Sequence, residues 1–171
     1  MTPLSEQSPL GPESTYGVSK RLAEDCALGY VDQLQLLILR PFNLIGPGMP
    51  DGLLIPDLLE RIDHPEPVLR MAGSNSVRDF VDVRDAIDAC IALLHIETPS
   101  GTAFNLSSGR GIAVSDLVAT FLRQLDLEKE IVFAGGGSTP IVGLSDRLQK
   151  AAGWKPKHSL EGTVASILKS R

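Results

Sequence analysis

The feature that most constrains this 171-residue chain is a run of four apolar residues at positions 36–39, followed by Arg40 and Pro41. A strand that is apolar at every position, and not only at alternate ones, is typical of a strand buried on both faces. Strands of this kind occur in parallel sheets with helices on either side. The run therefore favours an α/β fold.

Helical and extended patterns alternate along the rest of the chain. Helical periodicity predicts helices over 12–33, 53–62, 84–96, 115–125, 146–152 and 160–169. Further strands are expected over 68–71, 77–83, 102–106 and 131–133. Segments rich in glycine and proline predict loops over 1–11, 43–52 and 135–140. The alternation predicts one α/β unit spanning 1–171.

Local signals refine these helices. Pro12 suits a first helical turn, and Leu22, Cys26 and Tyr30 are spaced to form one apolar stripe. Ser145 and Ser159 are suitable N-caps, and Gly153 suits the position after a helix C-terminus. We expect Trp154 to pack the last helices, and Asp85 to cap or ion-pair at the start of its helix.

Tyr16 and Lys20 are the first candidates for chemistry. They stand four residues apart in a predicted helix, so both side chains lie on one face. A free phenol titrates near pH 10, and a neighbouring cation favours the phenolate. The pair suits proton exchange with an alcohol or ketone. Taken alone, the spacing favours the other interpretation, a packed tyrosine beside a solvated lysine, because a match of two residues is a weak motif.

Composition excludes several classes of function. A net charge of -5 without a basic stripe argues against nucleic-acid binding. No apolar run approaches the ~20 residues that span a bilayer, and no secretory leader is evident, so we expect a cytoplasmic protein. Cys26 and Cys90 are expected to be reduced thiols in the core. The three histidines show no ligand spacing, so no metal site is predicted.

Five ordered segments carry a family resemblance. They are Tyr-Gly-Val-Ser-Lys at 16–20, Arg-Pro-Phe-Asn-Leu-Ile-Gly-Pro-Gly at 40–48, Val-Arg-Asp-Phe-Val-Asp-Val-Arg-Asp at 77–85, Phe-Asn-Leu-Ser-Ser-Gly at 104–109 and Gly-Trp-Lys-Pro at 153–156. Over residues 3–168 the chain resembles the later half of the extended short-chain dehydrogenases/reductases, the NAD-dependent epimerase/dehydratase group. The run at 79–85 is most similar to the branch that includes GDP-4-keto-6-deoxymannose reductases.

The resemblance implies a role for each matching residue. Tyr16 would be the acid-base residue, and Lys20 would assist it and bind the nicotinamide ribose of NAD or NADP. Arg40, Pro41 and Phe42 would lie beside the nicotinamide. The implied substrate is a nucleotide sugar, and its contacts would be Asn43, Leu54, Ile55, Pro56 and Arg78. For Arg78 and Asp79 alone, a surface ion pair is the other interpretation.

The resemblance also shows what this sequence lacks. Family members open with a glycine-rich turn for the dinucleotide and carry a serine or threonine upstream of the tyrosine, and neither is evident before Tyr16. An arginine that many relatives carry near 136–139 is likewise not evident. Residues 12–52 would be the end of a Rossmann-type core, and 53–171 mostly a small substrate-binding α/β portion.

Two functional alternatives follow from the resemblance. The chain is either the substrate-side part of a nucleotide-sugar oxidoreductase, epimerase or dehydratase, or a truncated, non-catalytic module that binds a nucleotide sugar or another protein. The implied assemblies are a homodimer through the Tyr16–Lys20 helix, or pairing with a missing N-terminal half. An isolated half-sheet would also leave an apolar edge uncovered, so we expect poor solubility or self-association.

Overall fold

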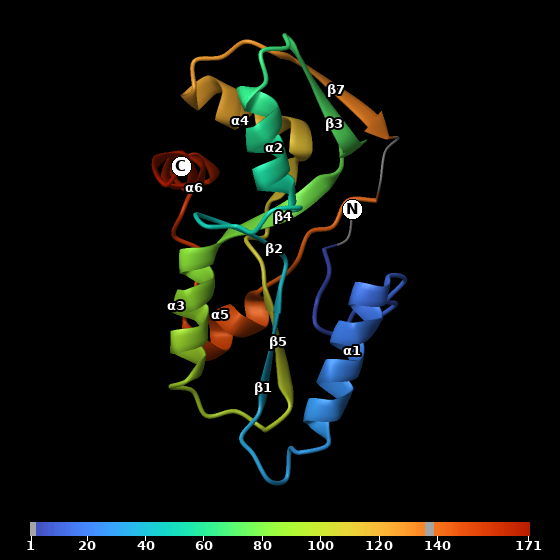
Figure 1. The fold of residues 1–171 in the computed structure, drawn as a ribbon. Helices are drawn as coiled ribbons and strands as arrows, with labels where there is room; N and C mark the ends of the chain where they lie inside the picture. Colours follow the sequence, from blue (N-terminus) through green and yellow to red (C-terminus); the bar gives the residue numbers. More distant parts are fainter. Residues whose placement is uncertain (1–2, 136–138) are drawn as a thin grey trace.

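The computed structural model describes residues 3–135 and 139–171 (Figure 1). Its helices are α1 (Thr15–Leu28), α2 (Leu54–Asp63), α3 (Val83–Leu93), α4 (Val114–Gln124), α5 (Asp146–Ala152) and α6 (Leu160–Lys169). Its strands are β1 (Leu37–Pro41), β2 (Asn43–Ile45), β3 (Val68–Ser74), β4 (Val77–Asp82), β5 (Thr102–Leu106), β6 (Gly111–Ala113) and β7 (Glu130–Gly135). The predicted alternation of helices and strands, and with it the α/β class, is confirmed.

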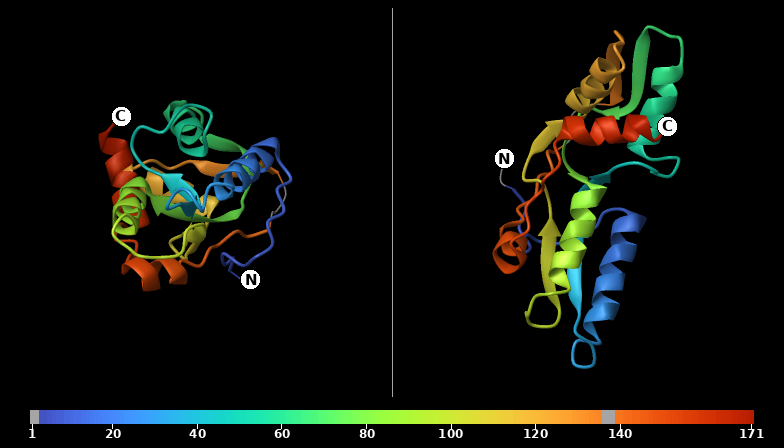
Figure 2. Two further views of the ribbon diagram at one scale, coloured as in Figure 1. Left: turned by 90° about the horizontal axis from the view of Figure 1, so that it is seen from below. Right: turned by 90° about the vertical axis from the view of Figure 1, so that its left-hand side faces the viewer.

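One end of the elongated molecule is built on β1 and β5, which pair in parallel with Leu37 opposite Thr102. Helices α3 and α5 lie on one side of this pair, and α1 lies on the other (Figures 1 and 2). The hydrophobic cluster here joins β5 to α3 and α5 through Phe104, Leu106, Ala89 and Leu148. Side chains from α1 are not among its buried members.

The other end holds two small sheets. One has the order β2-β4-β6, with β2 parallel and β6 antiparallel to β4, and the other is the parallel pair β3-β7. Helices α2, α4 and α6 pack here around a second hydrophobic cluster, which includes Leu58, Leu117 and Val164. Strand β5 and helices α3 and α5 belong to residues 53–171, yet they pack with β1 at this end of the molecule. The predicted division of the chain at residue 52, into a Rossmann-type part and a substrate-binding part, stays a prediction.

Three buried aspartates at the junction of β4 and α3 hold the C-terminal part of the chain. Asp79 accepts hydrogen bonds from the backbone N–H groups of Ser108, Gly109 and Gly143. Asp82 accepts the hydroxyl of Thr163 on α6 at 2.6 Å. Asp85 holds the turn before α6: it accepts the N–H groups of Lys157 and His158, and its Oδ1 lies 2.8 Å from His158 Nδ1.

Two of these contacts correct or extend the sequence predictions. Asp82, and not Asp85, is the N-cap of α3, because its carboxylate accepts the N–H of Arg84. Asp85 instead contacts His158 across the fold. Trp154 packs with α5, as expected, but its other helical partner is α3 and not α6, and its Nε1 donates to the Asp85 carbonyl oxygen at 2.9 Å.

Helix α1 differs from its prediction in length and in burial. It begins at Thr15, because the Ser14 side chain accepts the N–H of Gly17, so Pro12 precedes the helix. It ends at Leu28, before the predicted end at 33. None of its residues is buried, so the predicted stripe of Leu22, Cys26 and Tyr30 faces outward in this structure.

The expectation that both cysteines lie in the core is wrong. Cys26 is exposed because α1 buries no residue, and Cys90 is exposed because α3 turns Ala86, Ala89 and Leu93 inward. Ser145 precedes α5 but makes no capping bond, since its hydroxyl donates to the Ser107 carbonyl oxygen at 3.0 Å. Gly153 ends α5 as predicted, with φ 65°. Ser159 caps α6 as predicted, since its side chain accepts the N–H of Gly162.

The strands also depart from the sequence pattern in two ways. Strand β1 is only partly buried, because it pairs on one edge with β5 and has no strand on its other edge within the described residues. Strands β2 and β6 were not predicted, and each is three residues long. Both exist by pairing with β4, a long-range contact that local composition does not reveal. Half of the loop expected over 135–140 lies outside the described residues, and Gly135 belongs to β7.

Candidate active site

A cavity of about 780 Å³ lies where the two ends of the molecule meet. Of the ten predicted site residues, eight line the cavity: Tyr16, Arg40, Pro41, Phe42, Asn43, Leu54, Ile55 and Arg78. Lys20 lines an adjoining hollow that it shares with Arg40 and Glu24. Pro56 does not line the cavity and borders a separate hollow with Asp57 and Glu60. The structure therefore brings together residues that are up to 62 positions apart in the sequence, since Tyr16 and Arg78 line the same cavity.

The fold explains why these residues meet. Arg40 and Pro41 end β1, and Asn43 begins β2, so the chain crosses from one sheet to the next beside the cavity. Ligand sites in open α/β sheets lie outside the carboxyl ends of parallel strands. The first turn of α2 brings Leu54 and Ile55 to the opposite wall, where the buried side chain of Ile55 also joins the core.

Tyr16 and Lys20 lie on one face of α1, as their spacing predicts. The Lys20 ammonium is 5.3 Å from the centroid of the Tyr16 ring, within the range of a cation–π contact. Tyr16 is 71% exposed, so its phenol is open to a ligand in the cavity that it borders. Ser19 donates its hydroxyl to the Tyr16 carbonyl oxygen within the same helix turn.

Arg40, on β1, is held by the carboxylate of Glu24, which lies on α1 with Tyr16 and Lys20. Its Nε lies 2.8 Å from Glu24 Oε1, and one terminal nitrogen lies 2.6 Å from Oε2, in the two-point geometry of a strong guanidinium–carboxylate pair. The hydrogen bond with Glu24 raises the pKa of Arg40 despite partial burial, and the charge of Glu6 acts in the same direction. The guanidinium is thus charged and oriented by the protein.

Arg78 and Asn43 approach the cavity from the second sheet. Arg78 donates from one terminal nitrogen to the carbonyl oxygens of Val77 and Thr139, at 2.9 and 3.2 Å. Asn43 donates its side-chain amide to the Asp79 carbonyl oxygen at 3.0 Å. Because the Asp79 carboxylate is buried and accepts from Ser108, Gly109 and Gly143, Asp79 is part of the scaffold and not of a surface ion pair.

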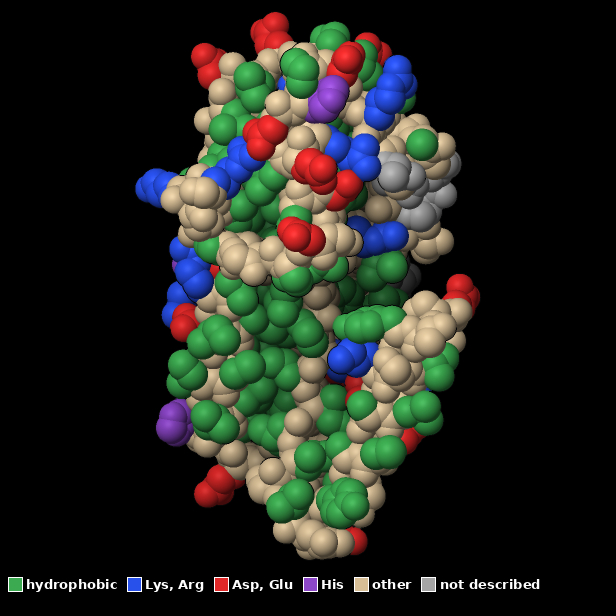
Figure 3. Space-filling model, in the orientation of Figure 1, with side chains coloured by type: hydrophobic (Ala, Val, Ile, Leu, Met, Phe, Trp, Pro, Cys, Tyr) green, Lys and Arg blue, Asp and Glu red, His purple; other side chains and the backbone are tan. Residues whose placement is uncertain are grey.

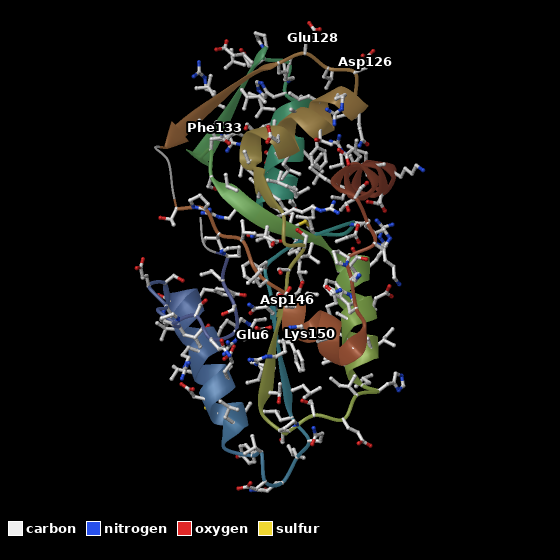
Figure 4. The ribbon with its side chains drawn as sticks, turned by 180° about the vertical axis from the view of Figure 1, so that it is seen from behind. Glu6, Asp126, Glu128, Phe133, Asp146 and Lys150 are labelled. Carbon is white, nitrogen blue, oxygen red and sulfur yellow. The ribbon has the colours of Figure 1, made fainter. Side chains whose placement is uncertain are left out.

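Sequence reasoning missed several residues at this site. Glu24 and Glu6 were not singled out, although Glu24 binds Arg40 and Glu6 accepts the N–H of Asn105 at 2.9 Å. Figure 4 shows Glu6 in the N-terminal segment, beside the strands and on the side where α1 lies. The spacing of Glu24, four residues after Lys20, was a usable signal, because it places all three side chains on one helix face.

Two further properties concern the described residues as a whole. Among residues 3–135 and 139–171, no three His, Cys, Asp or Glu side chains are grouped so that they could hold a metal ion. In the same part of the chain, no helix has the length and apolar character needed to cross a membrane.

Fold and cavity together define an α/β protein with a cavity at the ends of its parallel strands. Residues 1–107 match the family model described as the NAD dependent epimerase/dehydratase family. The chain belongs to this family.

Individual relatives agree with this assignment. The chain is 31% identical to GDP-6-deoxy-D-mannose reductase of Pseudomonas aeruginosa, over 97% of this chain and 58% of that protein. The structure of RMD from Pseudomonas aeruginosa, complexed with NADPH, superposes with a TM-score of 0.87 at 28% identity, covering 98% of this chain and 59% of that one. A dTDP-glucose 4,6-dehydratase from Bacillus anthracis, in complex with NAD, has a TM-score of 0.88 at 24% identity, with 99% and 56% covered, and shows the shared fold. The chain thus spans a little over half the length of these relatives.

Proposed function

We propose that this chain is the substrate-side part of an NAD(P)-dependent enzyme that reduces, epimerises or dehydrates a nucleotide sugar. The observation that supports this most is the convergence of Tyr16, Asn43 and Arg78 on one cavity, with Lys20 beside it. Within that class we favour reduction of a GDP-4-keto-6-deoxymannose-like substrate, because of the 31% identity to the Pseudomonas aeruginosa reductase.

Each residue has a role in this proposal. Tyr16 exchanges a proton with a sugar hydroxyl or ketone, and Lys20 supports it and binds the nicotinamide ribose. Arg78 binds the diphosphate, because a planar guanidinium matches phosphate oxygens, and Asn43 binds nearby. Leu54 and Ile55 form the wall around the base. The remaining cavity residues, Arg40, Pro41 and Phe42, border the nicotinamide.

The chain's residues fit one end of the dinucleotide. When bound, NAD(P) supplies or accepts the hydride. The exposed Tyr16 phenol, which lines the cavity, and the neighbouring Lys20 ammonium, which lines the adjoining hollow, are donors suited to the ribose end. The sequence contains no G-x-G-x-x-G turn for the pyrophosphate, so that part of the cofactor needs a cradle from elsewhere.

The open edge of β1 favours a partner unit that supplies the binding site for the dinucleotide pyrophosphate. Within the described residues β1 pairs only with β5, although parallel sheets are normally enclosed. Hydrophobic side chains gather over β1 and between α3 and α1 (Figure 3). The bordering helices expose Leu22 on α1 and Ile87 and Ile91 on α3. A dinucleotide-binding βαβ unit, in the same chain or another, would add a parallel strand here and cover these residues.

A homodimer through α1 is the other assembly that the exposed helix favours, because two copies of α1 could cover each other's apolar side chains.

The alternative function is a non-catalytic module that binds a nucleotide sugar or a protein at the same surface. Both functions allow binding of a nucleotide sugar, but only the enzyme converts it to a product.

The test has two stages. Calorimetric titration of the chain with NAD(H), NADP(H) and GDP-, UDP- and dTDP-sugars should give nucleotide-sugar binding without dinucleotide binding. Co-expression with a glycine-rich βαβ unit from a reductase of this family should then give hydride transfer, followed by absorbance at 340 nm. Binding without turnover would favour the non-catalytic module, and no binding of any nucleotide sugar would contradict the proposal.

The proton-transfer role is tested in the complemented enzyme by Tyr16→Phe. We expect turnover to fall by at least about 100-fold, as for loss of a general acid-base group, with nucleotide-sugar affinity retained. The control is Tyr30→Phe, which removes the other tyrosine of the chain, outside the cavity. Near-normal turnover of Tyr16→Phe would show that the acid-base assignment is wrong.

A further inference from the structure

Helix α1 carries the proposed proton-transfer pair but is weakly embedded. It has no buried residue, and a 14-residue helix is marginally stable without tertiary contacts. Apart from those of Glu24, the side-chain hydrogen bonds of α1 within the described residues stay inside the helix. Arg21 binds Asp25, and Ser19 donates to the Tyr16 carbonyl oxygen. What fixes this helix on the sheet therefore decides where Tyr16 and Lys20 lie.

The fixing contact is the ion pair of Glu24 with Arg40. Among the described residues, Glu24 is the one residue of α1 whose side chain hydrogen-bonds another element. The two side chains are about one-fifth exposed, at 21% and 22%, so solvent screens them less than it screens Arg21 and Asp25, at 44% and 45%. Two parallel hydrogen bonds also fix the direction of the guanidinium, which a single contact would not do.

The position of this pair links it to the cavity. Tyr16, Lys20 and Glu24 follow one another at intervals of four residues, so they form one row along α1. Arg40 lies at the end of β1 and lines both the cavity that Tyr16 borders and the hollow that Lys20 borders. A shift of α1 along β1 would move the phenol relative to Asn43 and Arg78 on the second sheet.

We propose that Glu24 and Arg40 are positioning residues: their bidentate pair holds α1 on the end of β1 and so sets the place of Tyr16 and Lys20 at the cavity. The inference rests on the proposed function for the importance of that place. It goes beyond the sequence prediction, which places Arg40 beside the nicotinamide, because it gives the Arg40 guanidinium the further role of holding α1 on β1.

Hydrogen exchange of the chain by itself tests the contact without any need for activity. Glu24→Gln and Arg40→Lys each remove the bidentate charged pair, and we expect amides in α1 to exchange at least about fivefold faster. Amides in α4, at the far end, should keep their rates. The matched control is Asp25→Asn, which breaks the exposed pair within α1 and should leave the rates of the helix within about twofold. The double variant Glu24→Arg/Arg40→Glu should recover slow exchange in α1.

Each outcome decides the proposal. Unchanged exchange in α1, or an equal rise in α1 and α4, would overturn it, since the pair would then be dispensable or merely part of global stability. If the complemented enzyme turns over, Glu24→Gln should lower kcat at least about tenfold with an unchanged KM for the nucleotide sugar, and an unchanged kcat would also overturn the positioning role. If it does not turn over, the proposed function fails, while the exchange data still decide whether the pair fixes α1.

Discussion

At the scale of single residues, the fold keeps the buried carboxylate of Asp82 charged by surrounding it with hydrogen-bond donors. Burial disfavours the ionised form of Asp82, but hydrogen bonds from Arg84 and Thr163 outweigh it and lower the pKa of Asp82 to about 2. A folded-state pKa below the unfolded value means that the ionised group stabilises the fold above about pH 4 and loses this effect as the pH falls toward 2. The contribution is about 2 kcal/mol at neutral pH.

Thr163→Val should therefore destabilise the chain, because it removes a buried donor to a charged carboxylate. We expect a loss of about 1–3 kcal/mol at pH 7 in urea unfolding, narrowing as the pH is lowered from 4 toward 2. Thr120→Val is the matched control. Thr120 is similarly buried and, like Thr163, donates to the carbonyl oxygen four residues earlier. It accepts a hydrogen bond from Arg123, and within the described residues it donates to no carboxylate. Equal losses in the two variants, at all pH values, would contradict this account of Asp82.

At the scale of elements, the C-terminal part is attached through the junction of β4 and α3. Asp85, on the first turn of α3, holds the turn that leads into α6, and Trp154 donates to its backbone. These bonds link α5 and α6 to α3 across about seventy residues of sequence. Local sequence signals predicted each of these helices separately, but not the residue that joins them.

Asp85 and Asp88 both bind Lys157, so substitutions of the two compare the effect of a buried carboxylate on stability with that of an exposed one. Asp85 is 1% exposed and accepts the Lys157 backbone N–H, whereas Asp88 pairs with the Lys157 ammonium at the surface. Asp85→Asn should lower the free energy of unfolding by about 2–4 kcal/mol, because a buried acceptor of several hydrogen bonds is lost. Asp88→Asn should leave the thermal midpoint unchanged. Similar effects of the two substitutions would show that the buried turn is not the attachment.

At the scale of the whole molecule, the apolar side chains that border β1 have no cover within the described residues. The predicted self-association of the chain follows, because an open parallel strand flanked by apolar helices pairs readily with another copy. Sedimentation velocity should show concentration-dependent association.

The double variant Ile87→Glu/Ile91→Glu should weaken this association, because it places two charges on the exposed side of α3. Leu127→Glu, which changes a similarly exposed leucine beyond α4, should not weaken it. If the unmodified chain stayed a compact monomer at high concentration, the apolar surface beside β1 would not mediate self-association.

The sequence by itself determined most of the elements and eight of the twenty residues that line the cavity. The helices at 54–63, 83–93 and 114–124 have strong apolar periodicity, and the strand at 102–106 is bounded by turn residues, so local physics suffices for them. The family resemblance selected Tyr16, Asn43 and Arg78, which the fold brings to one cavity.

The tertiary structure alone decided what depends on contacts between distant segments. Strands β2 and β6 exist through pairing with β4, and Glu24 finds Arg40 sixteen residues away only when α1 lies along β1. The cysteines and the apolar stripe of α1 face outward for the same reason: periodicity shows which residues share a helix face, but only packing decides whether another element covers that face.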